Sequence, residues 1–132
     1  MLFLLLACGP KTTPEPSAQA IGKASCERPE GLFGPVVRDD ALHAEASRFS
    51  QLGTTTSTPV EACGIEGQLQ ALLRMTCDDG SSPFSSAAQA HDARSGNLGA
   101  GGRCGSIIDL YQVPCPEATY PVHIDMYVCP SR

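Results

Sequence analysis

Two stretches near the carboxyl end decide the fold: SIIDLYQV at residues 106–113 and PVHIDMYVC at residues 121–129. In the second stretch every other side chain is apolar: Val122, Ile124, Met126 and Val128. A period of two is typical of a strand with one buried face. The segment between them contains two prolines, which favour a turn. We therefore predict an antiparallel hairpin with strands at 106–113 and 121–129.

The apolar alternation also predicts how the two strands pair. Placing Leu110 opposite Met126 brings Ile108 near Val128 on a face that packs against the rest of the domain. The opposite face then gathers two carboxylates, an imidazole and two phenols: Asp109, Tyr111, His123, Asp125 and Tyr127. Such a set could bind a ligand or perform acid–base chemistry. The commoner use is a solvated face on which tyrosines cover the sheet and accept or donate hydrogen bonds. We take this set as the candidate binding face.

The rest of the chain predicts one helix and much irregular structure. Leu42, Ala46 and Phe49 form an apolar stripe at helical spacing within residues 38–52, and Gly53 suits the end of that helix. Residues 67–77 alternate well enough to favour a strand, although their side chains have helical propensity and a helix remains open. Residues 81–104 read as a long loop with one short helix at 85–93.

These elements together predict an α+β fold, a small two-layer domain over residues 25–132. One main helix at 38–52 covers an antiparallel sheet that ends in the C-terminal hairpin, and disulfides staple the domain.

Length and charge limit what this domain can be. The chain has 132 residues, enough for one domain with a modest core, because aromatic residues make up only 5% and Trp is absent. The net charge is −5, and no two Lys or Arg residues are adjacent. A nucleic-acid surface needs a basic patch, so we expect no nucleic-acid partner.

The seven cysteines separate into one and six. Cys8 has its own explanation in the N-terminal segment, and the remaining six can form three disulfides: Cys26, Cys63, Cys77, Cys104, Cys115 and Cys129. Six cysteines allow fifteen pairings, and the predicted hairpin weakly favours Cys104 with Cys129. No Cys-x-x-Cys pair occurs, so we expect neither a metal site nor a cofactor.

The N-terminal segment is apolar from residue 1 to residue 7 and then reads Cys8-Gly9-Pro10. The tetrapeptide Leu5-Leu6-Ala7-Cys8 resembles the lipobox of bacterial lipoproteins. That resemblance implies a diacylglyceryl group on the Cys8 sulfur, palmitate-type acylation, and cleavage before Cys8. Because Gly9 is not Asp, it also implies sorting to the outer membrane.

On this interpretation residues 1–7 are the remnant of a signal peptide, and residues 8–24 are a lipidated, Pro-rich tether. No Lys or Arg precedes Cys8, so we expect the true start to lie upstream of Met1.

Two further motifs carry little chemistry. The Gly-rich stretch 96–103 could cradle an anion with Arg103, but it reads more simply as a loop leading to Cys104. Asp78-Asp79-Gly80 lacks the spaced oxygen ligands of a calcium loop and reads as a turn.

These features predict a lipid-anchored bacterial envelope protein whose domain binds or scaffolds an unknown ligand, and which is not an enzyme. Its expected partners are the membrane, through the lipid anchor, and an envelope protein or glycan. One alternative is a small envelope hydrolase that uses His123 with Asp109 or Asp125. A second is a purely structural envelope component.

Overall fold

The computed structural model describes residues 40–129, which form the α+β fold expected from the sequence. The elements follow in this order: the 3-10 helix η1 (Phe49–Gln51), β1 (Val60–Glu61), α2 (Gly64–Leu73), α3 (Ala87–Asp92), β2 (Arg94–Gly101), β3 (Ser106–Pro114) and β4 (Thr119–Asp125).

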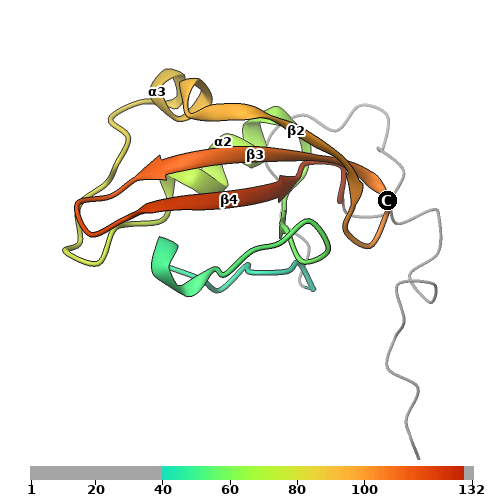
Figure 1. The fold of residues 1–132 in the computed structure, drawn as a ribbon, viewed down its shortest axis with the longest axis horizontal. Coiled ribbons are helices and arrows are strands. Elements are labelled where there is room, and N and C mark those ends of the chain that lie inside the picture. The colour runs from blue at the N-terminus through green and yellow to red at the C-terminus, as the bar shows by residue number, and fades with distance from the viewer. Residues whose placement is uncertain (1–39, 130–132) are drawn as a thin grey trace, which may run out of the picture.

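The strands form one sheet in the order β1-β4-β3-β2 (Figure 1). The predicted C-terminal hairpin is confirmed as β3 and β4, which pair antiparallel. The sheet is nevertheless mixed, because the short β1 pairs parallel to β4. At the other edge, β2 pairs with β3 through a ladder interrupted twice, between Arg94 and Gly96 and between Asn97 and Ala100.

The predicted register of the hairpin is wrong by three residues. Asp109 lies opposite Ile124, and Leu110 lies opposite His123. The turn sets this register, because the Cys115 N–H donates to the Ala118 carbonyl and the strands therefore begin pairing early, at Pro114. An odd shift exchanges the faces of one strand relative to the other. Tyr111, rather than Leu110, consequently faces the core.

The strand predicted at residues 67–77 is wrong, since most of this segment lies in α2, the main helix. Its buried positions Gln68, Ala71 and Leu72, continued by Met75, follow the spacing of one helical face. A glutamine stands on this buried face, and so hydrophobicity alone does not show the stripe. The helix propensities of Leu, Ala, Gln and Glu gave the correct indication.

The helix predicted at 38–52 is also wrong within the part that is described. Residues 42–45 form an isolated turn in which His43 has a φ of +63°, and only η1 follows. The backbone here bonds to distant strands and loops: the Glu61 N–H donates to the Leu42 carbonyl, and the Phe49 N–H donates to the Thr76 carbonyl. Gly53 does end η1 in the left-handed region, with a φ of +50°.

The long loop predicted at 81–104 contains the expected short helix and an unexpected strand. The short helix is α3, whose first turn is capped where the Ser86 hydroxyl accepts from the Gln89 N–H at 3.2 Å. The Gly-rich residues that read as a loop instead form β2. Position 101 requires a glycine, because a Cβ there would collide with the backbone carbonyl of Thr56.

The helices and the sheet make two layers around one core. In Figure 1, α2 lies behind β3 and β4, and the segment from residue 40 to the start of β1 runs along the β4 side of the sheet. The core comprises thirteen buried side chains: Phe49, Leu52, Val60, Ala62, Ala71, Leu72, Met75, Phe84, Ala90, Tyr111, Val113, Val122 and Ile124.

Disulfides link the two layers at both ends of the domain. Cys63 pairs with Cys129, which joins the start of α2 to the chain beyond β4. Cys77 pairs with Cys115, which joins the end of α2 to the β3–β4 turn. Cys104 is disulfide-bonded too, but its partner is not among residues 40–129. The pairing of Cys104 with Cys129 predicted from the hairpin is therefore wrong, because the register differs and β1 brings Cys63 beside the end of β4.

The expectations for Cys8, Cys26, the signal remnant and the tether lie outside the described residues. Within residues 40–129, none of the helices has the length and apolar character needed to cross a membrane.

Candidate functional site

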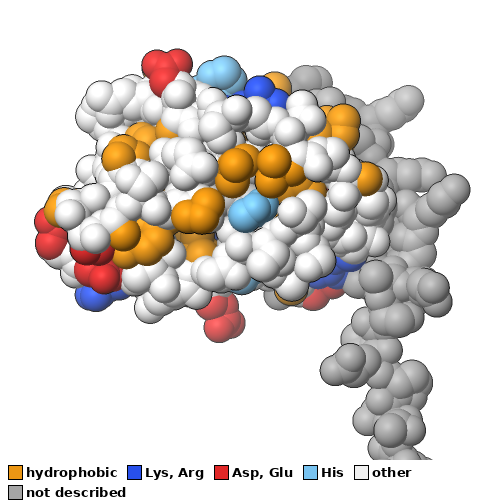
Figure 2. Space-filling view, in the orientation of Figure 1, with side chains coloured by type: hydrophobic (Ala, Val, Ile, Leu, Met, Phe, Trp, Pro, Cys, Tyr) orange, Lys and Arg blue, Asp and Glu red, His pale blue; other side chains and the backbone are white. Residues whose placement is uncertain are grey.

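The predicted binding face does not exist as one surface, because the register distributes its residues over both faces of the sheet. Asp109 and Tyr111 share the face of Val122 and Ile124, beneath α2. His123 and Leu110 lie on the opposite face. Figure 2 shows hydrophobic side chains gathered around histidine atoms on the face turned to the viewer, with charged side chains toward its edges.

Asp109 and Tyr111 belong to a buried polar network under α2. The Gln68 amide nitrogen donates to Asp109 Oδ2 at 3.0 Å and also to the Tyr111 hydroxyl. Arg94 donates to Asp109 Oδ1 at 2.9 Å from the first residue of β2. Burial raises the pKa of Tyr111, so its phenol stays protonated. This network holds α2 and β2 against β3 by hydrogen bonds.

Among residues 40–129, His123 makes hydrogen bonds to neutral groups. Its Nδ1 lies 3.0 Å from the Thr54 hydroxyl, and its backbone N–H donates to the same oxygen at 3.0 Å. Burial lowers its pKa, which favours the neutral imidazole at pH 7. Neither Asp109 nor Asp125 hydrogen-bonds to it among the described contacts. The structure therefore does not bring together the residues that a hydrolase mechanism at His123 would need.

Asp125 lies at the centre of a second buried charged cluster. It is fully buried, and its neighbour across the parallel β1–β4 pair is Glu61. Asp125 Oδ1 accepts from the Tyr127 N–H at 2.9 Å, whereas Oδ2 has no hydrogen-bond partner within the described part of the chain. Burial, together with the charge of Glu61, raises the pKa of Asp125 to about 6. The half-buried Tyr127 contributes its backbone to this site.

Arg103 neutralises the rest of that cluster. Its guanidinium binds both carboxylate oxygens of the buried Glu61 at 2.6 Å and donates to Asp40 Oδ2 at 3.0 Å. The glycines before it allow this approach: a Cβ on Gly102 would lie 3.0 Å from Asp125 Oδ2. The anion cradle considered for 96–103 is thus excluded as a free site, because Arg103 is already committed to two carboxylates.

Three side chains of these two clusters were not predicted from the sequence: Glu61, Gln68 and Arg94. Gln68 and Arg94 were hidden by the wrong elements assigned to their segments. Glu61 stands in the run Val60-Glu61-Ala62-Cys63, and a single charge within a short apolar run was the available signal of a buried ion pair.

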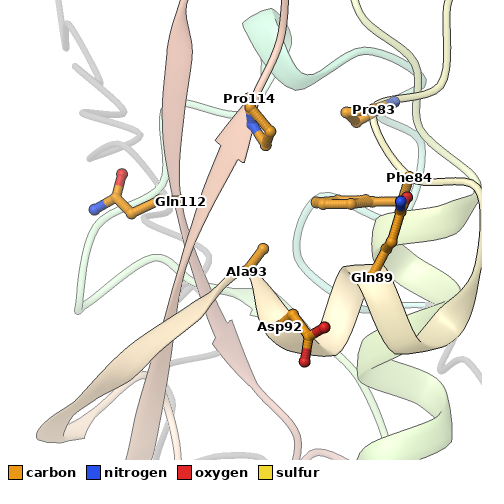
Figure 3. Close-up of a pocket in the computed structure, with 7 residues that line it drawn as sticks. All are labelled: Pro83, Phe84, Gln89, Asp92, Ala93, Gln112 and Pro114. Atoms are coloured by element: carbon orange, nitrogen blue, oxygen red, sulfur yellow. The ribbon is translucent and has the colours of Figure 1, made fainter.

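An open groove lies between α3, the 83–84 segment and the end of β3. Its volume is about 340 Å³, and its lining combines apolar and polar side chains: Pro83, Phe84, Gln89, Asp92, Ala93, Gln112 and Pro114. In Figure 3 the ring of Phe84 projects into the space between Pro114 and Ala93. None of the residues of the predicted binding face lines this groove.

One group with metal-ligand atoms occurs among residues 40–129, formed by Cys77, Cys115 and Glu117. The two sulfurs are joined in a disulfide and so have no free thiolate to offer. Glu117 accepts from the Asp78 N–H at 2.8 Å, which gives this carboxylate a structural task at the turn.

Within residues 40–129, these features define a small, disulfide-stapled α+β domain with buried polar clusters and an open groove. Comparison with protein-family models, with curated proteins and with solved structures finds no match to this chain.

Proposed function

We propose that this chain is an exported bacterial lipoprotein, anchored at the outer membrane through Cys8, whose domain binds a ligand without catalysing a reaction. Two features support export. The Leu5-Leu6-Ala7-Cys8 segment resembles a lipobox, and every cysteine of residues 40–129 is disulfide-bonded. Stable disulfides are typical of oxidising compartments outside the cytosol.

The groove is the observation that carries binding. Two polar groups of its lining are unused within the described residues: the Asp92 carboxylate makes no hydrogen bond or ion pair, and the Gln89 amide nitrogen makes none, although the Gln89 oxygen accepts from Ser85. Unpaired polar groups around an apolar floor are the usual arrangement of a recognition site. Asp92 is the one residue of the lining that could act as an acid or a base. This favours a binding site over a catalytic site.

Export and anchoring are tested by expressing the chain from its full gene with an alkyne-bearing fatty acid. The proposal expects the label on the wild-type protein in the membrane fraction, and loss of both label and membrane association in Cys8→Ser. Thr13→Ser, a change of similar size in the tether, is the control and should behave as wild type. A Cys8→Ser protein that stays with the outer membrane would refute the anchor.

Binding at the groove is tested in cells by placing a photo-crosslinking amino acid at Gln89, an exposed residue of its lining. The control position is Gln70, which is exposed on α2 and is not part of the lining. The proposal expects a discrete adduct from position 89 and none from position 70. Equal or absent adducts at both positions would contradict binding and favour a purely structural envelope component.

A further inference from the structure

We infer that residues 31–37 dock on an exposed apolar surface at the β2–β3 turn, held there by a disulfide between Cys26 and Cys104; the choice of Cys26 rests on the proposed lipid at Cys8. The bonding of Cys104 is the first argument. It is disulfide-bonded, and the other four cysteines of residues 40–129 bond to one another. Within the chain, Cys8 and Cys26 remain as its partner. A sulfur that carries a diacylglyceryl group forms no disulfide, which leaves Cys26.

Forming this bond follows the chemistry of the other two disulfides. The Cys26 and Cys104 thiols lose two protons and two electrons as their sulfurs join, and a protein disulfide of the oxidising compartment accepts them by thiol–disulfide exchange. The same class of oxidant must form the bonds at the two ends of α2. The third bond therefore needs no additional reagent.

An ion pair fastens the other end of the same segment to the same turn. Arg103, the residue before Cys104, donates to Asp40 Oδ2 at 3.0 Å and to the Asp40 backbone carbonyl at 3.0 Å. Asp40 follows Cys26 by fourteen residues. An extended chain spans at most about 3.6 Å per residue, so a segment with both ends held at this turn doubles back and stays within about 25 Å of it.

The surface that this segment meets carries two exposed isoleucines. Ile107 is 50% exposed, and Ile65 is 58% exposed. Ile107 and Asp109 are alternate residues of β3 and so share the face that α2 covers. Gln68, which bonds to Asp109, lies about one helical turn after Ile65. Because a disulfide joins the residues that follow α2 and β3, the two elements run in the same direction. Ile65 and Ile107 are therefore exposed on the same side of the sheet, toward the β2–β3 turn.

The docking segment supplies matching side chains. Residues 31–37 contain no charged residue and have four large apolar ones: Leu32, Phe33, Val36 and Val37. The two phenylalanines within residues 40–129, Phe49 and Phe84, are both buried. Packing the segment against Ile65 and Ile107 removes apolar surface from water on both partners, which is the main favourable contribution to such a contact.

The disulfide is tested on wild-type protein purified without reductant from cells that export it. After unfolding, digestion with trypsin and chymotrypsin cuts at Tyr111, between Cys104 and Cys115, so mass spectrometry identifies the partner of Cys104 directly. We expect a peptide pair that joins Cys26 to Cys104.

The docking is tested on the same protein by hydrogen exchange. We expect the backbone amides of residues 32–37 to exchange at least about tenfold more slowly than those of an unstructured chain. Ile107→Ser should speed this exchange at least about threefold, because it removes half of the apolar surface. The matched control is Gln112→Ser, an exposed position on the opposite face of the same strand, which should change the exchange by less than about 1.5-fold.

Two kinds of result would overturn the inference, and they bear differently on the proposed anchor. A bond between Cys8 and Cys104 would refute both the inference and the lipid at Cys8. A Cys26–Cys104 bond with unprotected amides at 32–37, or an Ile107→Ser variant that exchanges like the control, would refute the docking alone. If both measurements agree with expectation but the fatty-acid label is missing from Cys8, the inference stands and the anchor fails.

Discussion

The buried carboxylate of Asp125 makes the stability of this domain depend on pH in an unusual direction. Its pKa in the folded state is about 6, compared with an ordinary value of 3.8. The folded state therefore keeps a proton that the unfolded chain has already released between these values. Because the folded state binds more protons there, the free energy of unfolding falls as pH rises from about 4 to about 6, and it levels off above about 7.

The size of this effect follows from the two pKa values. At about 1.36 kcal/mol per pKa unit, ionised Asp125 costs the folded state about 3 kcal/mol at neutral pH. About 1.4 kcal/mol of that is recovered on going from pH 7.5 to pH 5, where the folded-state carboxyl is mostly protonated. The side chain is fully buried, so solvent screening does not reduce these figures substantially.

Asp125→Asn removes the charge and keeps the oxygen that accepts from the Tyr127 N–H. The new amide lacks an assured acceptor, which costs about 1 kcal/mol. We expect the variant to be more stable than wild type by about 2 kcal/mol at pH 7.5. We also expect this difference in the free energy of unfolding between Asp125→Asn and wild type to be about 1.4 kcal/mol smaller at pH 5.

Urea unfolding at the two pH values, followed by circular dichroism with the disulfides intact, measures both quantities. Glu66→Gln removes an exposed carboxylate from the first turn of α2 and should shift stability by less than about 1 kcal/mol, equally at both pH values. A gap between Asp125→Asn and wild type that is the same at pH 5 and pH 7.5 would refute the reasoning, whatever its sign.

Three other substitutions test the remaining contacts by the same unfolding assay. The double change Cys77→Ser and Cys115→Ser opens a loop of 38 residues and should cost about 4 kcal/mol through the greater entropy of the unfolded chain; a loss below about 1 kcal/mol would contradict the stapling role. Tyr111→Phe removes a buried acceptor from the network under α2 and should cost about 1 kcal/mol, whereas Tyr120→Phe at the exposed β3–β4 end should cost under about 0.5. Arg103→Gln leaves the buried carboxylate of β1 without its cation and should cost about 3–5 kcal/mol, and a neutral effect would show that this pair is dispensable.

The sequence predicted those parts of the fold that depend on short-range patterns. The β3–β4 hairpin, the short helix α3 and the α+β class follow from alternation, capping residues and turn chemistry. The register was missed because it depends on the turn at 115–118, where a backbone hydrogen bond and a disulfide select the pairing. The apolar residues Ile108 and Leu110 suggested that their face of β3 was the one that packs on the core. Residues on both faces of this sheet are buried near β1, so this alternation did not identify the core face.

The candidate site was missed for a related reason. Asp109, Tyr111 and Asp125 looked like a solvated or functional face, because isolated carboxylates are seldom buried. Distant residues accompany their burial: Gln68 bonds to Asp109 and Tyr111, Arg94 bonds to Asp109, and Arg103 pairs with Glu61, the neighbour of Asp125. No short-range pattern reveals partners that lie 15 to 43 residues away along the chain. The groove depends on how α3 packs against β3, which is equally invisible to periodicity.

The interrupted pairing of β2 affects whether two copies of this domain can associate edge to edge. An exposed edge strand offers a template on which a second chain can add its own strand. Here Gly96 and Gly99 adopt φ values of +139° and +84°, and the ladder shifts register twice, so the outer edge of β2 cannot present a regular row of donors and acceptors. The opposite edge, β1, is only two residues long. Both edges of the sheet would thus resist strand exchange and fibril growth, including at the high surface density that the proposed lipid anchor would produce.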